Sequence, residues 1–169
     1  VVFAPNPGPQ TEFLAASEQE VLYGGAAGGG KSFGLLADPM RYFHNPNFNG
    51  LILRRTNDEL RELIWKSQEL YPKAFPGAKW AEKKSQWTLP SGAKLWLTYL
   101  EREDDVRRYQ GLAFSYIAFD ELTQHPTPFA WDYMRSRLRT TDPDLPIFMR
   151  ATTNPGGAGH GWVKQMFID

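Results

Sequence analysis

Eight consecutive residues near the start of the chain have the composition and spacing of a phosphate-binding loop. The segment Gly25-Ala26-Ala27-Gly28-Gly29-Gly30-Lys31-Ser32 satisfies the pattern G-x-x-x-x-G-K-[ST]. Glycines let the backbone turn its N–H groups inward around a phosphate chain, and the positive end of the following helix favours the anion. The pattern predicts that Lys31 reaches the outer phosphates of ATP and that the Ser32 hydroxyl is a ligand of Mg²⁺. The alternative is a flexible glycine-rich turn before a helix.

Two adjacent carboxylates, Asp120 and Glu121, follow the apolar run Tyr116-Ile117-Ala118-Phe119. Such a run is typical of a strand that is covered on both faces, and open α/β sheets bind ligands at the carboxyl ends of their strands. We therefore expect Asp120 to hold Mg²⁺ through water, and Glu121 to orient and deprotonate the attacking water. The alternative is an exposed acidic pair that caps the next helix.

Small polar residues follow a third apolar segment, in Thr152-Thr153-Asn154-Pro155-Gly156. At a strand end beside a phosphate site, Thr153 and Asn154 can hydrogen-bond the γ-phosphate or the attacking water and so report whether the phosphate is present. Thr-Asn-Pro-Gly is also an ordinary turn. Gln10 precedes the first strand, and its amide can read the adenine edge, although a plain surface glutamine fits equally well.

Arginines are further candidates, because a guanidinium from the same chain or a neighbour stabilises the charge that develops in phosphoryl transfer. Arg135, Arg137 and Arg139 flank the apolar stripe of a predicted helix and point in different directions. A solvated basic face and a DNA contact are the alternatives. Arg54-Arg55 and Arg107-Arg108 are equally ambiguous.

The elements that position these residues alternate between strand and helix. Apolar strands are predicted at 20–23, 51–53, 116–119 and 146–153, and helices at 31–43, from the capping-box pattern Thr56-Asn57-Asp58-Glu59 onward, and at 129–139. Two segments around Pro90-Ser91-Gly92 are predicted to form a β-hairpin. This order predicts an α/β fold, a three-layer P-loop fold of the ASCE type with a largely parallel central sheet.

Composition limits the function classes. The chain has 169 residues, of which 41% are hydrophobic, so we expect one folded domain. Lys plus Arg and Asp plus Glu both number 19, so any nucleic-acid contact must come from a local patch. With no cysteine and three scattered histidines a zinc site is excluded on spacing. No apolar run is long enough to cross a bilayer, so no membrane partner is expected.

Taken together, the motifs resemble the N-terminal ATPase domain of the large terminase subunit, the motor that packages DNA into tailed-phage and herpesvirus-type capsids. The resemblance covers nearly the whole chain. It depends on the Gln10 segment, the glycine-rich loop, the approach Arg108-Tyr109-Gln110-Gly111 to Asp120-Glu121, and the Thr152 to Gly157 ending.

The resemblance implies roles for individual positions. Lys31 and Ser32 match the nucleotide-binding pair, Asp120 the Mg²⁺-associated aspartate and Glu121 the catalytic glutamate. Thr153-Asn154 matches the motif that couples hydrolysis to movement. Arg135 and Arg137 lie where the family places arginines that act on the nucleotide of an adjoining ring subunit.

The resemblance also implies partners and a location. We expect weak binding of double-stranded DNA by the isolated domain, a homo-oligomeric ring, and contacts with the portal protein and the small terminase subunit. The site of action would be the host cytoplasm, at the procapsid portal. The family's C-terminal nuclease domain is expected to lie beyond these residues. Two other functions remain possible at this point: a helicase- or recombinase-like ATPase, and a nucleotide-gated DNA-binding module without turnover.

Overall fold

The computed structural model describes residues 2–5, 19–24, 30–154 and 156–168. In these residues the strands are β1 (Val2–Pro5), β2 (Glu20–Gly24), β3 (Asn49–Arg54), β4 (Lys79–Ala81), β5 (Gln86–Thr88), β6 (Lys94–Tyr99), β7 (Tyr116–Phe119) and β8 (Phe148–Thr152). The α-helices are α2 (Gly30–Ala37), α3 (Asn57–Ala74), α4 (Phe129–Arg135) and α5 (His160–Phe167). Short 3-10 helices are η1 (Asp38–Tyr42), η2 (Glu103–Tyr109) and η3 (Leu122–Gln124).

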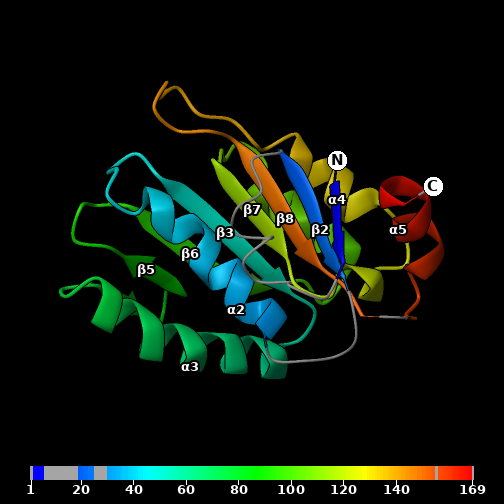
Figure 1. Ribbon diagram of the computed structural model, residues 1–169, viewed down its shortest axis with the longest axis horizontal. Coiled ribbons are helices and arrows are strands. Elements are labelled where there is room, and N and C mark those ends of the chain that lie inside the picture. Colours follow the sequence, from blue (N-terminus) through cyan, green and yellow to red (C-terminus); the bar gives the residue numbers. More distant parts are fainter. Residues whose placement is uncertain (1, 6–18, 25–29, 155, 169) are drawn as a thin grey trace.

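The strands form one sheet in the order β1-β2-β8-β7-β3-β6-β5-β4. The first six strands in this order, β1-β2-β8-β7-β3-β6, are parallel to their neighbours. Strand β5 runs antiparallel to β6, and β4 runs antiparallel to β5. The predicted α/β fold with a largely parallel sheet and an added β-hairpin is therefore confirmed. In this order β8 lies between β2, which leads to the glycine-rich loop, and β7, which leads to the acid pair (Figure 1).

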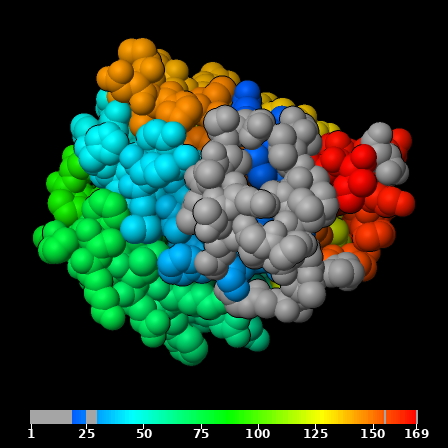
Figure 2. All heavy atoms as spheres, viewed as in Figure 1, coloured from blue at the N-terminus to red at the C-terminus, as the bar shows by residue number. Residues whose placement is uncertain are grey.

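Helices cover both faces of the sheet and create two cores. On β2, Val21 and Tyr23 belong to the core under α2 and α3, and Leu22 belongs to the core under α4 and α5. This alternation follows from the pleat, which points successive side chains to opposite faces. The view in Figure 1 has α2 and α3 in front of the sheet, and Figure 2 shows their atoms, in blue to cyan and green, lying over that face.

Helix α3 begins as its sequence predicts, with Thr56 as the N-cap whose side chain accepts from Glu59 N–H. Two other helices are shorter than predicted. Helix α2 ends at Ala37 and the chain continues as η1, because Pro39 lacks the N–H that an α-helix needs. Helix α4 ends at Arg135, because the following residues pair with Phe114 in a β-bridge centred on Leu138.

The last strand also differs slightly from the prediction of residues 146–153. It begins at Phe148, whose N–H donates to Ser115 O, and ends at Thr152. The shift leaves Thr153 and Asn154 beyond the end of the strand, where their side chains are not committed to the two cores. No helix in the described part of the chain is long and apolar enough to span a membrane.

Candidate functional site

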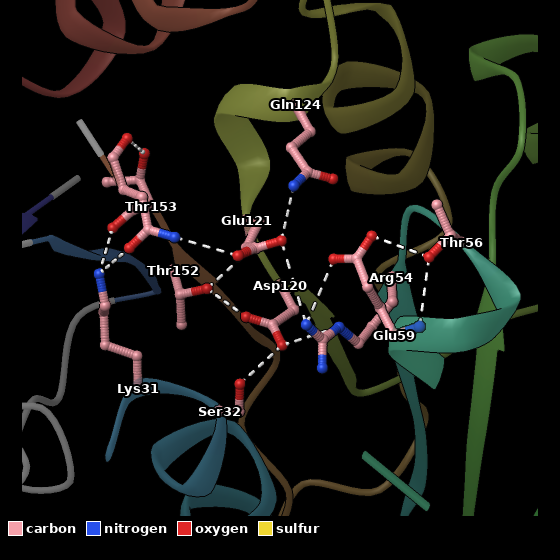
Figure 3. A network of polar contacts seen from close by, with 11 residues as sticks. Lys31, Ser32, Arg54, Thr56, Glu59, Asp120, Glu121, Gln124, Thr152 and Thr153 are labelled. Atoms are coloured by element: carbon pink, nitrogen blue, oxygen red, sulfur yellow. Dashed lines mark hydrogen bonds and ion pairs between the residues drawn. The ribbon is translucent and has the colours of Figure 1, made fainter. Parts of the chain in front are cut away.

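The register of the sheet aligns the predicted site residues in one row. Leu53 pairs with Phe119, and Phe119 with Ala151, so the next residues along the three strands, Arg54, Asp120 and Thr152, are neighbours. Asp120 N–H continues the ladder by donating to Leu53 O. Residues far apart in sequence therefore meet at the carboxyl ends of parallel strands, opposite the start of α2 (Figure 3).

Lys31 at the start of α2 reaches across to the end of β8. Its Nζ donates to Thr153 O at 2.8 Å and also to Asn154 Oδ1. Burial lowers the pKa of Lys31 from its ordinary value, and the charges of Asp120 and Glu121 oppose that shift. The predicted phosphate-binding lysine and the two residues predicted to report the phosphate are thus in direct contact.

Asp120 is buried, with 2% of its side chain exposed, and hydroxyls and a guanidinium surround it. Its Oδ2 accepts from Ser32 Oγ at 2.9 Å, and its Oδ1 accepts from the Thr152 hydroxyl. The Nε of Arg54 lies 3.1 Å from Oδ2. These contacts give a buried carboxylate the hydrogen bonds and the opposite charge without which its burial would be costly.

Glu121 has a left-handed backbone conformation, with φ 57° and ψ 58°, which is uncommon for a residue with a side chain. Its N–H donates to Thr152 Oγ1 at 2.8 Å, which fixes this turn. The carboxylate accepts from Asn154 Nδ2 at 3.0 Å and from Gln124 Nε2 at 2.7 Å. The backbone turn therefore separates the two adjacent acids, since Asp120 is directed to Ser32 and Glu121 to the polar residues after β8 and in η3.

The pKa of Glu121 is strongly shifted. Burial, followed by a hydrogen bond and charge repulsion from Glu59 and the charge of Asp120, raises the pKa of Glu121 to about 7, while Arg54 opposes the shift. A carboxylate with a pKa near neutrality is suited to accept a proton at physiological pH. The geometry thus supports the base role predicted for Glu121.

Three further residues belong to this cluster. In the sequence Arg54 is an ambiguous candidate, Glu59 enters only as part of a helix cap, and Gln124 has no role. The Arg54 guanidinium lies between the carboxylates of Asp120, Glu121 and Glu59 (Figure 3). The signal for Arg54 is its position at the end of a buried strand; for Glu59 and Gln124 the sequence carries no comparable signal.

The donor set next to Lys31 fits Mg²⁺. Ser32 Oγ and the Asp120 carboxylate are adjacent hard oxygen ligands, which Mg²⁺ prefers. Within the described ranges no group of three or more His, Asp or Glu residues gathers to hold a metal by itself. Such a sparse set is typical of Mg²⁺ sites in which substrate phosphates and water complete the coordination.

Other predicted residues lie elsewhere. Gln10 and the loop residues Gly25, Ala26, Ala27, Gly28 and Gly29 lie outside the described residues. Arg135 pairs with Glu20 at 2.8 Å, at the amino end of β2, and with Asp132. This is the sheet edge opposite to the acid pair, so Arg135 does not belong to the cluster of its own chain. Arg137 lies beyond the end of α4, and its Nε donates to Ser136 Oγ at 3.4 Å.

The comparisons with known proteins point to one family. A family model described as terminase large subunit, T4likevirus-type, N-terminal, matches residues 22–168. No curated protein matches the chain in sequence.

Solved structures of three phage proteins share the fold. The large terminase of a thermophilic bacteriophage has a TM-score of 0.73 at 18% identity, covering 95% of this chain and 41% of that one. The complex of that terminase with ADP has a TM-score of 0.62 at 16% identity, covering 86% and 37%. The Thermus phage P74-26 large terminase ATPase domain has a TM-score of 0.64 at 14% identity, covering 90% and 66%.

The N-terminal domain of the bacteriophage phi29 DNA packaging ATPase has a TM-score of 0.65 at 16% identity, covering 94% of this chain and 86% of that one. A chain of the phi29 viral genome packaging motor assembly has a TM-score of 0.62 at 15% identity, covering 94% and 50%. The chain thus spans about two fifths of the length of the thermophilic phage terminase that it matches.

Proposed function

Because the chain belongs to the family of N-terminal domains of terminase large subunits, we propose that it hydrolyses ATP and that hydrolysis drives double-stranded DNA into a viral procapsid. The observation that carries this proposal is the meeting of Lys31, Asp120 and Glu121 at one sheet edge, with Asn154 bonded to both Lys31 and Glu121. The ADP complex of the similar thermophilic phage terminase supports nucleotide as the ligand.

Each residue of the cluster has one task in this proposal. Lys31 leaves Thr153 and Asn154 to bind the outer phosphates, and Ser32 with Asp120 holds Mg²⁺. The bound metal supplies positive charge that neutralises the phosphate oxygens. Glu121 orients the attacking water and takes its proton, and its pKa of about 7 allows that transfer near neutral pH.

Asn154 couples ATP hydrolysis to movement of the chain in this proposal. Its side chain accepts from Lys31 through Oδ1 and donates to Glu121 through Nδ2. Transfer of Lys31 to phosphate removes one of these bonds and frees the segment after β8 to rearrange. Both ends of that segment contact η3, since Thr123 Oγ1 donates to Asn154 O at 3.3 Å and Gly159 N–H donates to Thr123 O at 2.7 Å. A change at Asn154 is therefore passed to the loops at this sheet edge.

Arginines from a neighbouring subunit complete the proposal. In a homo-oligomeric ring Arg135 or Arg137 would act on the nucleotide of the next subunit. Arg137 is the better supported of the two, because Arg135 is engaged by Glu20 and Asp132. The portal protein, the small terminase subunit and weakly bound DNA are the proposed partners, and the host cytoplasm at the portal is the proposed location.

The test compares two variants of the site with one remote control. Lys31→Ala should lose both ATP binding and phosphate release. Glu121→Ala should still bind ATP but release phosphate at least about 100-fold more slowly, the typical minimum for loss of a general base. Glu62→Ala, an exposed change on α3, should behave as wild type. Substantial hydrolysis by Glu121→Ala would remove that residue from its role.

The DNA part of the proposal needs a separate measurement. With ATP and duplex DNA the protein should translocate without separating the strands, and phosphate release per subunit should rise with protein concentration if arginines come from a neighbour. Strand separation would favour a helicase. A lack of turnover at every concentration would favour a nucleotide-gated binding module.

A further inference from the structure

One guanidinium nitrogen of Arg54 lies between two carboxylates. Its NH2 is 3.3 Å from Glu59 Oε2 and 4.0 Å from Glu121 Oε2. Arg54 is held from the other side by Asp120, 3.1 Å from its Nε, and only 7% of its side chain is exposed. A buried guanidinium cannot turn to water, so this nitrogen is shared between the two glutamates, and it lies nearer to Glu59.

Glu59 is the better anchored competitor. It lies in the first turn of α3, where its N–H donates to Thr56 Oγ1 and its Oε1 accepts from the Thr56 hydroxyl at 2.9 Å. The helix cap thus fixes one carboxylate oxygen and leaves the other for Arg54. Figure 3 shows this chain of contacts from Thr56 through Glu59 and Arg54 to the acid pair.

Glu121 has other partners in this arrangement. Asn154 and Gln124 each donate to one of its carboxylate oxygens, at 3.0 Å and 2.7 Å. Both partners are neutral amides, whose hydrogen bonds are weaker than those of a guanidinium. If Arg54 were released from Glu59, its NH2 would move the short distance to Glu121 and form the stronger, charge-assisted bond.

We propose that Glu59 is a positioning residue for hydrolysis, which holds Arg54 away from Glu121 so that the Glu121 carboxylate stays on Asn154 and Gln124 and remains available to water. Glu59 lies close enough to Glu121 to interact with its carboxyl group directly, but the effect on hydrolysis proposed for it is exerted through Arg54. The inference rests on the proposed ATPase function and assigns to the cap of α3 a second role at the hydrolytic centre.

The consequence is a separation of turnover from binding. Without Glu59, Arg54 pairs with Glu121, and the carboxylate is both turned from the water position and less able to accept a proton. ATP binding depends on Lys31, Ser32 and Asp120, whose contacts do not include Glu59. A merely structural role for Glu59 would instead lower stability, and binding and turnover together.

The experiment uses two variants that remove the same charge from the same helical turn. Glu59→Gln removes the carboxylate that pairs with Arg54, and Asp58→Asn removes an exposed neighbouring carboxylate. Both lose a similar interaction with the helix dipole, and in Glu59→Gln the pair of Arg54 with Glu121 replaces the lost pair with Glu59, so their melting temperatures should lie close together. We expect kcat for phosphate release to fall about tenfold in Glu59→Gln only, a tenth of what a general base contributes at the least. The affinity for a non-hydrolysable ATP analogue should stay within about twofold in both variants.

Each other result has one meaning. Equal kcat in the two variants, or a joint loss of kcat, affinity and melting temperature in Glu59→Gln, would overturn the role of Glu59. If Glu59→Gln folds poorly, Glu59→Asp keeps the charge but shortens the reach to Arg54, and a kcat equal to wild type would overturn the inference too. Absence of turnover in the wild-type protein would refute the ATPase proposal itself, which is a different outcome from wild-type turnover that Glu59 does not affect.

Discussion

Arg150 and Arg54 are both buried, and each lies next to a buried aspartate, but the surroundings of the two pairs differ. In the middle of β8, Arg150 Nε is 2.8 Å from Asp38 Oδ2, and the side chains are 1% and 0% exposed. Arg150 NH1 also donates to Met149 O, and its guanidinium lies over the ring of Phe148. This ion pair joins the segment after α2 to the centre of the sheet and is closed to water.

The pair of Arg54 with Asp120, at the carboxyl ends of the strands, has partners that water can reach. The Arg54 guanidinium lies within ion-pair distance of the carboxylates of Asp120, Glu59 and Glu121. The side chains of Glu59 and Glu121 are 24% and 23% exposed. Three acids against Arg54 and Lys31 leave an excess of negative charge, which a metal ion or a moving side chain can redistribute. The exposure of an arginine's acidic partners, rather than its own burial, therefore separates a structural ion pair from a responsive one.

Removal of Asp38 should have the largest effect. Asp38→Ala leaves the guanidinium of Arg150 buried without its carboxylate, at a cost of about 3–5 kcal/mol in the free energy of unfolding. Urea unfolding followed by circular dichroism measures it. Asp142→Ala, which removes an aspartate bonded to the surface residues Asn45 and Asn47, is the control and should cost much less. A loss no greater than the control's would show that the Arg150 pair is not structural.

Removal of Arg54 should cost less stability and more function. Arg54→Met leaves Asp120 bonded to Ser32 and Thr152, so we expect a loss of about 1–3 kcal/mol. Without Arg54, Lys31 is the protein's remaining positive charge beside these acids, so Mg²⁺ should raise the melting temperature of this variant more than that of wild type. Arg55→Met is the matched control, because Arg55 donates to Leu100 O and, among the residues that the structure describes, to no acid. An equal response to Mg²⁺ in all three proteins would contradict the assignment.

The same contrast shows what the sequence could and could not predict. Lys31, Ser32, Asp120 and Glu121 could be predicted as a site because their chemistry is encoded in local patterns at strand ends, and strand order brings them together. The apolar runs predicted β2, β3, β7 and β8, and the segments around Pro90-Ser91-Gly92 predicted the β5–β6 hairpin, whereas β1 and β4 were not predicted. Thr56 predicted the start of α3. The ends of α2 and α4 were missed because η1 and the bridge to Phe114 depend on Pro39 and on tertiary pairing.

The partners of the site residues could not be predicted in the same way. The pairing of Arg54 with Asp120 requires knowing that β3 and β7 are neighbours in register, which no pattern in either strand specifies. Glu59 has an ordinary explanation in the sequence as a capping residue, and that explanation is correct but incomplete. Asp38 in η1 and Arg150 in β8 lie 112 positions apart in the sequence, and neither belongs to a motif that indicates an ion pair.

The raised pKa of Glu121 predicts how the stability of the protein depends on pH. Between about pH 4.5 and 7 the folded protein keeps a proton on Glu121 that the unfolded chain has released, so this residue makes stability fall as pH rises. Glu121→Gln removes that dependence and should be more stable than wild type by about 2 kcal/mol above pH 7, after allowance for partial exposure. The gain should disappear below about pH 4.5. Urea midpoints from pH 4 to 8 measure it, and a gain that is constant with pH would contradict the shift.

The smallest effect is expected from removing both members of the closed pair. In Asp38→Leu with Arg150→Met no buried charge is left unpaired, and apolar side chains of similar volume replace the ion pair in a region bounded by Phe148 and Tyr116. Such replacements are commonly neutral or stabilising, so the double variant should unfold within about 1 kcal/mol of wild type although Asp38→Ala does not. It should also retain the kcat of wild type, because neither residue contacts the acid pair. No such double replacement is available around Arg54. Replacing Arg54 and Glu59 together by apolar residues leaves the carboxyl groups of Asp120 and Glu121 without a guanidinium. A double variant at the closed pair that unfolds as easily as Asp38→Ala would show that Arg150 is needed for its hydrogen bonds to the backbone rather than for its charge.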